Sequence, residues 1–308
     1  MLIIYRSLIN LLLLISPLIL LLRILKGKED LSRFFEKYGF STFEKKRKKL
    51  IWFHGSSVGE ILSVIPIIEK IEKEKKNLQI LITSNTLSSS KVLKKYNFKR
   101  TSHQFLPIDS NIIVKKFLNH WKPNLVIFIE SEIWPNFLNE VNSRGIPLIL
   151  LNARITKRTY KNWMYFQKFA KENFNKFDLC LSQNDETTFF LKRLGGKNII
   201  KCGNLKFSIS NARILKTLSK KTTKFFSMKK ILFGGFSTHD TEEKFCTDIH
   251  LKLKNKFKEL LTIIIPRHTF RTNEIIEELN IKKIKFHRHS SKQKIQKDTE
   301  IYLVDTFG

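Results

Sequence analysis

The chain is poor in the residues that build metal centres and disulfide frameworks. It has three cysteines among 308 residues, Cys180, Cys202 and Cys246. They are widely spaced and form no Cys-x-x-Cys pair. A disulfide scaffold is therefore excluded. We expect free, mostly structural thiols in a reducing compartment.

Common nucleotide-binding and nucleic-acid-binding motifs are also missing. The sequence contains neither a G-x-x-x-x-G-K-[ST] loop nor a G-x-G-x-x-G turn. It has no internal repeat of the length that builds solenoids or propellers. It also lacks any helix-turn-helix, zinc-finger or RNP signature. An interpretation as a basic nucleic-acid-binding protein is therefore supported only by net charge, and we expect no nucleic-acid partner.

Acidic residues are scarce relative to basic ones. Lys and Arg number 57 and Asp and Glu 27, which gives a net charge of +30. Such an excess favours polyanionic partners: nucleic acid, anionic lipid headgroups or phosphorylated substrates. The lysines are scattered, however, and Lys, Ile, Asn and Phe are all abundant, as an AT-rich coding sequence would produce. Compositional drift remains an alternative explanation for much of the charge.

One long apolar run lies at the N-terminus. Residues 7–22 read SLINLLLLISPLILLL, without a charge, between Arg6 and Arg23. Sixteen helical residues reach about 24 Å, short of the ~30 Å hydrocarbon core. The run therefore predicts either a tilted span extended by residues 2–5 or an anchor lying partly in one leaflet. Pro17 predicts a kink in it.

The flanks of this run separate an anchor from a cleaved signal peptide. No small-x-small cleavage site follows, because the next residues are RILKGKEDLSR. This favours a membrane anchor over residues 1–26. The Lys and Arg residues on its C-terminal side place the remainder at the cytoplasmic face of the membrane.

After residue 48, apolar runs of strand length alternate with helical stretches. This alternation predicts a parallel sheet covered on both faces, hence an α/β fold. We expect one unit over 27–207, a polar linker over 208–228, and a second unit over 229–308 that stops directly after a strand. The expected strands are 50–54, 78–84, 102–109, 123–130, 146–153, 178–183, 198–204, 229–235, 260–266, 281–287 and 300–305. The expected helices are 60–75, 86–96, 111–120, 134–143, 158–175, 185–194, 240–258 and 271–279.

Polar motifs follow successive strands, where an open α/β sheet binds its ligands. They are HGSSVGE (54–60), TSNT (83–86), ESEIWPN (130–136), NARIT (152–156), SQNDE with GNLKF (203–207), GGFSTHDTEE (234–243) and PRHTFR (266–271). Each has a simpler interpretation: Glu60 as a charge at a helix N-terminus, or STHD as an N-cap. Seven such motifs across two units are more than capping requires.

Together these motifs resemble the bacterial 3-deoxy-D-manno-octulosonate (Kdo) transferases. HxxSVGE, ExExWPN, NAR, GNLKF, STHxxEE and PRH appear in the family's order, and the likeness extends from the apolar N-terminus to VDTFG. The resemblance implies a GT-B glycosyltransferase with two Rossmann-like domains. It also implies transfer of Kdo from CMP-Kdo to a lipid A precursor at the cytoplasmic face of the inner membrane, among anionic lipids, with no metal ion or other cofactor.

The resemblance also implies roles for individual residues. Glu60 matches the family's general base, which would take the proton of the acceptor hydroxyl in an inverting displacement. The expected substrate-binding residues are His54, Ser57, Gly59, Thr83, Thr86, Glu130, Glu132, Asn152, Arg154, Asn204 and Lys206. The expected CMP-donor-binding residues are Gly235, Ser237, Thr238, His239, Glu243, Arg267 and His268.

Three departures from the family pattern affect the donor side. Phe236 stands where the family has a small residue, and Thr269-Phe270-Arg271 replaces its Pro-Glu-Arg. The family continues beyond D-T-x-G into a glycine-rich loop and an N-x-L-E-P motif, which are not in this sequence. We therefore expect an incomplete donor domain, and a non-catalytic remnant of such an enzyme is an alternative.

Overall fold

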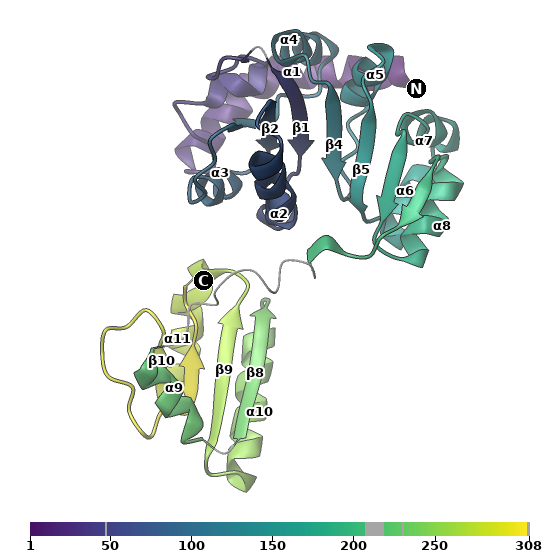
Figure 1. The fold of residues 1–308 in the computed structure, drawn as a ribbon. Helices are drawn as coiled ribbons and strands as arrows, with labels where there is room; N and C mark the ends of the chain where they lie inside the picture. Colours follow the sequence, from purple (N-terminus) through teal and green to yellow (C-terminus); the bar gives the residue numbers. More distant parts are fainter. Residues whose placement is uncertain (47, 207–218, 230, 307–308) are drawn as a thin grey trace. The chain divides into compact units, whose positions relative to one another are not determined.

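The computed structural model describes residues 1–46, 48–206, 219–229 and 231–306. The chain divides into two compact units, Met1–Arg213 and Ile214–Gly308 (Figure 1). Each unit contains a parallel sheet with helices packed on it. The predicted α/β class with two Rossmann-like units is thereby confirmed.

The first unit is built on a seven-stranded sheet of order β3-β2-β1-β4-β5-β6-β7, with parallel pairing throughout. Successive residues of a strand face opposite sides, so Trp52 packs in one buried apolar cluster and Phe53 in the other. Both faces of the sheet are thus covered, as the apolar runs predict. The strands are β1 (Lys49–His54), β2 (Leu78–Ser84), β3 (Thr101–Phe105), β4 (Leu125–Ile129), β5 (Leu148–Ala153), β6 (Leu179–Ser182) and β7 (Ile199–Lys201).

Helices follow these strands at the expected places. The predicted helical stretch 158–175 is two helices, which meet at Tyr165 and Phe166. The strand predicted over 102–109 ends at Phe105, shortly before Pro107, which has no N–H to donate to a ladder. The helices are α2 (Val58–Glu74), α3 (Leu87–Leu93), α4 (Asn111–Trp121), α5 (Pro135–Ser143), α6 (Lys157–Met164), α7 (Gln167–Phe174) and α8 (Asp185–Leu194).

The second unit has a four-stranded parallel sheet of order β10-β11-β9-β8. The linker prediction needs correction, because helix α9 (Lys220–Ser227) lies inside the stretch expected to be a linker, and its Phe225 is buried with Leu261 and Tyr302. The rest of that stretch, up to residue 218, lies outside the described residues. The remaining elements are β8 (Ile231–Thr238), α10 (Glu242–Lys256), β9 (Leu260–Pro266), η3 (Thr269–Arg271), α11 (Thr272–Ile281), β10 (Phe286–Arg288) and β11 (Ile301–Leu303).

The apolar N-terminal run forms helix α1 (Leu2–Leu25). Its 24 residues extend past both flanking arginines and reach about 36 Å, so by length and composition it could cross a membrane. The helix continues through Pro17. Proline removes the bond to the carbonyl four residues back, and here the Ser16 hydroxyl donates to that carbonyl of Leu13 at 2.7 Å.

One side of α1 is docked on the first unit, beside α4 and α5 (Figure 1). The Tyr5 hydroxyl donates to Asp109, and Ser110 donates to Asn10 at 3.0 Å. Further along, the Ser16 and Tyr38 hydroxyls are 3.1 Å apart. The other side is a row of exposed Leu and Ile side chains, such as Leu14 at 78% exposure. We call this row the exposed face of α1; its residues are Ile3, Ile4, Leu8, Leu11, Leu12, Leu14, Ile15, Leu18, Ile19, Leu21, Leu22 and Leu25.

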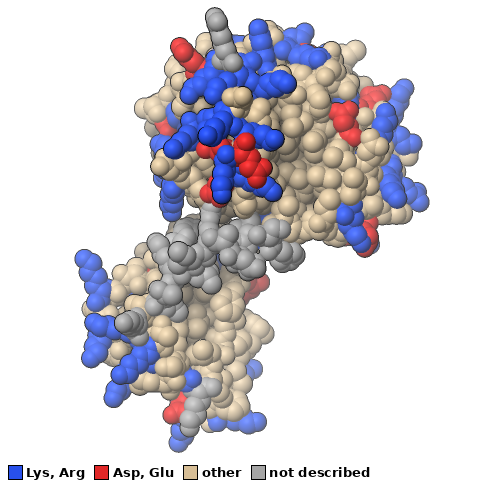
Figure 2. Space-filling model, viewed as in Figure 1, with Lys and Arg blue, Asp and Glu red and all other residues tan. Residues whose placement is uncertain are grey.

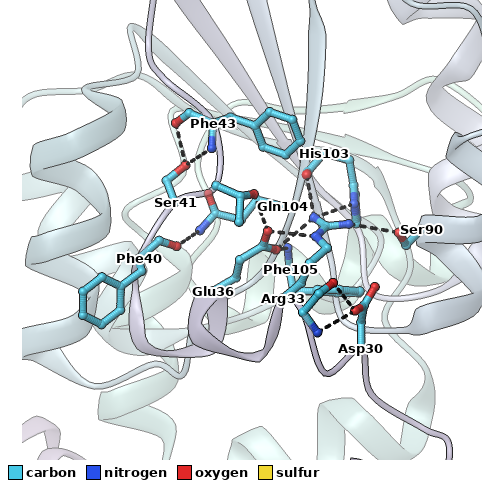
Figure 3. Close-up of polar contacts among 12 residues, drawn as sticks. Asp30, Arg33, Glu36, Phe40, Ser41, Phe43, Ser90, His103, Gln104 and Phe105 are labelled. Atoms are coloured by element: carbon cyan, nitrogen blue, oxygen red, sulfur yellow. Dashed lines mark hydrogen bonds and ion pairs between the residues drawn. The ribbon is translucent and has the colours of Figure 1, made fainter.

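A buried ionic network fixes the segment that follows α1 (Figure 3). Glu36, in the 3-10 helix η1 (Phe34–Tyr38), is fully buried and accepts hydrogen bonds from the Arg33 guanidinium, the Thr42 hydroxyl and the Phe105 N–H. Arg33 also donates to the carbonyl of His103. Burial, with the positive charge of Arg33 beside it, lowers the pKa of His103 to about 3, so this imidazole is neutral. No element was expected here from the sequence.

Positive charge is spread over the surface. Figure 2 shows Lys and Arg side chains distributed over both units. This distribution matches the scatter seen in the sequence, and it leaves the charge available to a broad anionic surface.

Candidate active site

The turn between β1 and α2 places Glu60 at the start of a helix. Ser57 is the N-cap of α2, and its hydroxyl oxygen accepts a hydrogen bond from the Glu60 N–H at 3.3 Å. In return, the Glu60 carboxylate accepts from the Ser57 hydroxyl and from the Ser56 N–H, both at 2.7 Å. This is a variant of the capping box, because the carboxylate bonds to the N–H of Ser56, one residue before the N-cap, and not to the N–H of the N-cap itself. The simpler interpretation of Glu60 as a helix-start residue therefore describes its bonding correctly.

The same carboxylate has the properties of a base. Glu60 is half-buried, and burial raises its pKa, with the bonds from Ser57 and Ser56 lowering it in part and the charges of Glu132 and Glu130 raising it further. Each carboxylate oxygen has a second lone pair beyond the one used in the cap. Glu60 can therefore accept a proton from a bound hydroxyl while the helix start stays intact.

Gly55 and Gly59 have different neighbours in this turn. A Cβ on Gly55 would lie 3.1 Å from the side chains of Glu60 and Ile129. A Cβ on Gly59 would be in ordinary contact with the Lys206 ammonium, at 3.9 Å. Gly55 is thus closely packed, whereas exposed Gly59 lies beside a cation.

His54 and Glu132 form a second pair next to Glu60. His54 is fully buried, and its Nε2 lies 3.1 Å from Glu132. Its Nδ1 lies 2.9 Å from the hydroxyl of Thr83, which also accepts from the Trp52 indole. The Trp134 indole donates to Glu132 at 2.8 Å. Burial opposes ionisation of Glu132, but the hydrogen bonds from His54 and Trp134 lower its pKa.

Glu130 is held by Lys206. It follows β4 with a left-handed backbone, φ 60°, and its carboxylate forms an ion pair with Lys206. Arg154 is exposed, and its backbone N–H donates to the Glu130 carbonyl. The segments that follow β1, β4, β5 and β7 thus supply two cationic side chains, Lys206 and Arg154, and three carboxylates, Glu60, Glu130 and Glu132.

Asn152 and Asn204 organise the approach to Lys206. Asn152 is buried with φ 54°, and its side-chain oxygen accepts from the Leu205 N–H at 3.0 Å. Asn204 accepts from the Lys206 N–H at 3.0 Å. The Asn152 side-chain nitrogen has no hydrogen-bond partner among the described residues. Both amides therefore shape the GNLK loop as far as the structure describes it.

The TSNT turn supports the site from one side. Thr86 is the N-cap of α3, and its hydroxyl oxygen accepts from the Ser89 N–H. Asn85 donates to the Ser56 hydroxyl at 2.6 Å. Ser56, Asn85 and Trp134 thus belong to this network but were given no role from the sequence. The sequence offered one signal for such residues, namely a hydroxyl or indole side chain next to a carboxylate of a motif.

The residues expected to bind the donor lie in the second unit, around the end of β8. The Thr238 hydroxyl donates to Glu243 at 2.9 Å, and Arg271 donates to both oxygens of Glu243 at 3.1 and 3.0 Å. Glu243 is 1% exposed. Arg271, the last residue of the Thr269-Phe270-Arg271 segment, therefore neutralises the Glu243 carboxylate.

The other expected donor residues surround this ion pair. Ser237 has a left-handed backbone, φ 59°, and a Cβ on Gly235 would lie 2.7 Å from the Cys246 sulfur, so Gly235 is required by packing. His239 and His268 are exposed with ring centroids 6.1 Å apart. The Arg267 N–H donates to the Thr238 carbonyl. In the part of the chain that the structure describes, no group of three His, Cys, Asp or Glu side chains could hold a metal ion.

The family model and the similar proteins agree on one family. The family model described as 3-Deoxy-D-manno-octulosonic-acid transferase (kdotransferase) matches residues 32–209. A 3-deoxy-D-manno-octulosonic acid transferase of Rickettsia bellii is 32% identical and covers 99% of this chain, which spans 72% of that protein. The Rickettsia felis transferase is 36% identical over 85% of this chain and 56% of its own length. The Haemophilus influenzae transferase is 27% identical over 97% of this chain and 71% of its own length.

Solved structures similar to this chain share its fold. A putative UDP-N-acetylglucosamine 2-epimerase from Listeria monocytogenes aligns with a TM-score of 0.58 at 11% identity, over 83% of this chain and 68% of that one. The UDP-GlcNAc 2-epimerase from Neisseria meningitidis aligns at 0.56 and 12% identity, over 84% and 72%. Their likeness supports the GT-B type of α/β architecture. The chain spans little more than half the length of the R. felis relative.

Proposed function

The chain belongs to the 3-deoxy-D-manno-octulosonic-acid (Kdo) transferase family, and from that premise we propose that it transfers Kdo from CMP-Kdo to a lipid A precursor, lipid IVA. The observation that carries the proposal is the placement of Glu60. A half-buried carboxylate with a raised pKa lies beside the His54–Glu132 pair and the Lys206 cation. This combination suits deprotonation of a hydroxyl on an anionic acceptor.

In the proposed transfer, Glu60 is the proton acceptor. The acceptor hydroxyl gives its proton to the Glu60 carboxylate as its oxygen bonds to the anomeric carbon of Kdo. The bond from that carbon to the phosphate oxygen breaks, and cytidine monophosphate leaves with the electron pair. A single displacement of this kind inverts the anomeric centre. No covalent enzyme intermediate is required.

Charged side chains would orient the two substrates. Lys206 and Arg154 lie next to Glu130 and would attract the phosphates of a lipid A precursor. In the second unit, exposed His239, His268 and Arg267 would contact the donor phosphate. Glu243 is 1% exposed and already accepts from Thr238 and Arg271, so it would hold these two side chains in place and not contact the ribose itself.

Membrane attachment belongs to the same proposal. The exposed face of α1 would enter the cytoplasmic leaflet of the inner membrane, where the acceptor resides. The net charge of +30 would add attraction to anionic lipids. An apolar helix together with a basic surface supplies the two signals that stable attachment needs.

The capping box provides the test of the catalytic base. Glu60→Gln keeps the cap, because Gln serves at this position of a capping box, but it cannot take a proton. We expect its transfer rate from CMP-Kdo to lipid IVA to fall about 10²- to 10⁴-fold with the melting temperature unchanged. Glu60→Ala removes both functions and should also lower stability. Near-normal transfer by Glu60→Gln would reject Glu60 as the base.

A further inference from the structure

Asp109 is a buried carboxylate that the proposed reaction does not use. It lies between β3 and α4, is 3% exposed, and accepts hydrogen bonds from three groups. The N–H groups of Asn136 and Phe137, in the first turn of α5, donate to it at 3.1 and 2.9 Å. The Tyr5 hydroxyl of α1 donates to it at 2.7 Å. Asp109 thus joins α1 to the start of α5.

Neighbouring contacts repeat this connection. The Arg6 guanidinium donates to the side-chain oxygen of Asn136 at 2.9 Å, and the Asn136 amide donates to the Asp109 carbonyl at 2.5 Å. The Tyr5 ring packs near Phe169, with centroids 6.3 Å apart. Two consecutive residues of α1 are therefore bonded, directly or through Asp109, to the first turn of α5.

The start of α5 is also the end of the loop that carries Glu132. Trp134 is the N-cap of α5, and Pro135 is its first residue. The Trp134 indole and the His54 ring both bond to Glu132. A shift of the first turn of α5 would therefore move Trp134, and with it the carboxylate next to Glu60.

We propose that Tyr5 and Asp109 are positioning residues, which use the docked α1 to fix the first turn of α5 and so the geometry of Glu132 and His54. The inference rests on the proposed function of that site. It assigns α1 a second role beyond attachment: the site reaches its working geometry when Tyr5 is bonded to Asp109.

A matched pair of variants separates this role from anchoring. Tyr5→Phe removes the hydroxyl by which α1 bonds to Asp109. Tyr38→Phe, in η1, removes the hydroxyl that bonds to Ser16, further along α1. Neither changes the exposed face of α1. The measurements are binding to vesicles containing anionic lipid, kcat and KM for both substrates, and hydrogen exchange of peptides covering residues 130–140, all on the full chain.

We expect both variants to bind vesicles like the parent. Tyr5→Phe should lower kcat about tenfold or more, as small displacements at an active site do, with the KM for CMP-Kdo unchanged, and it should speed exchange over 130–140. Tyr38→Phe should change neither kcat nor the hydrogen exchange over residues 130–140. The double variant Tyr5→Phe/Asp109→Asn should lose no more activity than Asp109→Asn alone, because the two side chains act as one unit.

Other outcomes distinguish failure of this inference from failure of the proposed function. Unchanged exchange over 130–140 in Tyr5→Phe overturns the positioning role, whatever the activity. Loss of vesicle binding that accounts for the whole loss of kcat also overturns it. Absence of Kdo transfer by the parent chain, with exchange still faster in Tyr5→Phe, contradicts the proposed function and leaves the link between α1 and α5 supported.

Discussion

At the scale of single residues, Glu60 combines two functions that were alternatives in the sequence. It completes the cap of α2 through Ser57, and it is a half-buried carboxylate with a raised pKa. A base must be ionised to act, so its pKa sets the acid limit of the reaction. Helix capping and the proposed proton transfer would therefore depend on the same pair of side chains.

The pH dependence of transfer should report this carboxylate. Because the pKa of Glu60 is raised above its ordinary value, we expect kcat/KM, which reports ionisations of the free protein, to fall on acidification beginning at a pH above that value, about tenfold per pH unit below the midpoint. Ser57→Gly removes the hydroxyl that lowers this pKa, while Gly at an N-cap costs only a few tenths of a kcal/mol. The midpoint should move to higher pH in Ser57→Gly; a pH–rate profile that stays fixed would contradict the assignment.

A second prediction concerns the ion pair in the second unit. Arg271→Ala would leave the Glu243 carboxylate buried without its cation. We expect a loss of about 3–5 kcal/mol in the free energy of unfolding of this unit, measured by urea denaturation. Arg267→Ala, at an exposed neighbour, should stay within about 0.5 kcal/mol.

The double variant Arg271→Ala/Glu243→Gln tests the physical cause of that loss. The introduced glutamine side chain would be buried in place of the carboxylate but would carry no charge, so part of the lost stability should return. If the double variant is no more stable than Arg271→Ala, packing and not charge explains the effect.

At the scale of elements, the regular strands and helices could be predicted from the sequence because burial on both sheet faces leaves long apolar runs. The segment between α1 and β1 could not. It has no periodic pattern, and its order comes from Arg33, Glu36 and Thr42 meeting His103 and Phe105 from β3. Pairing between residues about 70 positions apart leaves no local signal.

That network should contribute strongly to stability. Glu36→Ala would leave the Arg33 guanidinium, which is 14% exposed, without its counter-charge and the Phe105 N–H without its acceptor. We expect a loss of about 3–5 kcal/mol in the free energy of unfolding. Glu44→Ala, two residues beyond Thr42 and exposed, serves as the control and should change it by about 0.5 kcal/mol or less. Equal stability of the two variants would show that the network adds nothing.

The candidate site shows a similar division. Its carboxylates, His54 and Lys206 could be found because the ends of parallel strands gather at one edge of a sheet. Their partners could not: the bonds from Trp134 to Glu132 and from Asn85 to Ser56 depend on side-chain direction. Neither could the contact between Tyr5 and Asp109 be predicted, since an apolar terminal run gives no reason to expect a specific polar contact with the rest of the unit.

At the scale of the whole molecule, α1 and the net charge act together. The exposed face of α1 is apolar, and Lys and Arg are spread over both units (Figure 2). Apolar insertion does not depend on salt, whereas attraction between a basic surface and anionic lipid is screened. Membrane binding should therefore have a salt-sensitive and a salt-resistant part.

Vesicle binding can separate these parts. We expect binding to anionic vesicles to weaken between low and high salt without disappearing, and binding to neutral vesicles to be weaker and insensitive to salt. Leu14→Asp, at a side chain 78% exposed, should reduce binding to both kinds of vesicle without affecting folding. Full release of the parent protein from anionic vesicles by salt alone would show that α1 does not insert.

The reciprocal bonding of Ser57 and Glu60 also bears on how activity is recognised in relatives. Selection for a stable helix start would keep Glu60 even in relatives that have lost activity. The presence of Glu60 therefore does not show that a relative is an active enzyme. The Arg154 side chain, by contrast, is exposed. In relatives that lose activity, we expect Arg154 to be replaced before Glu60. Arg154 would therefore be the more informative marker of retained activity.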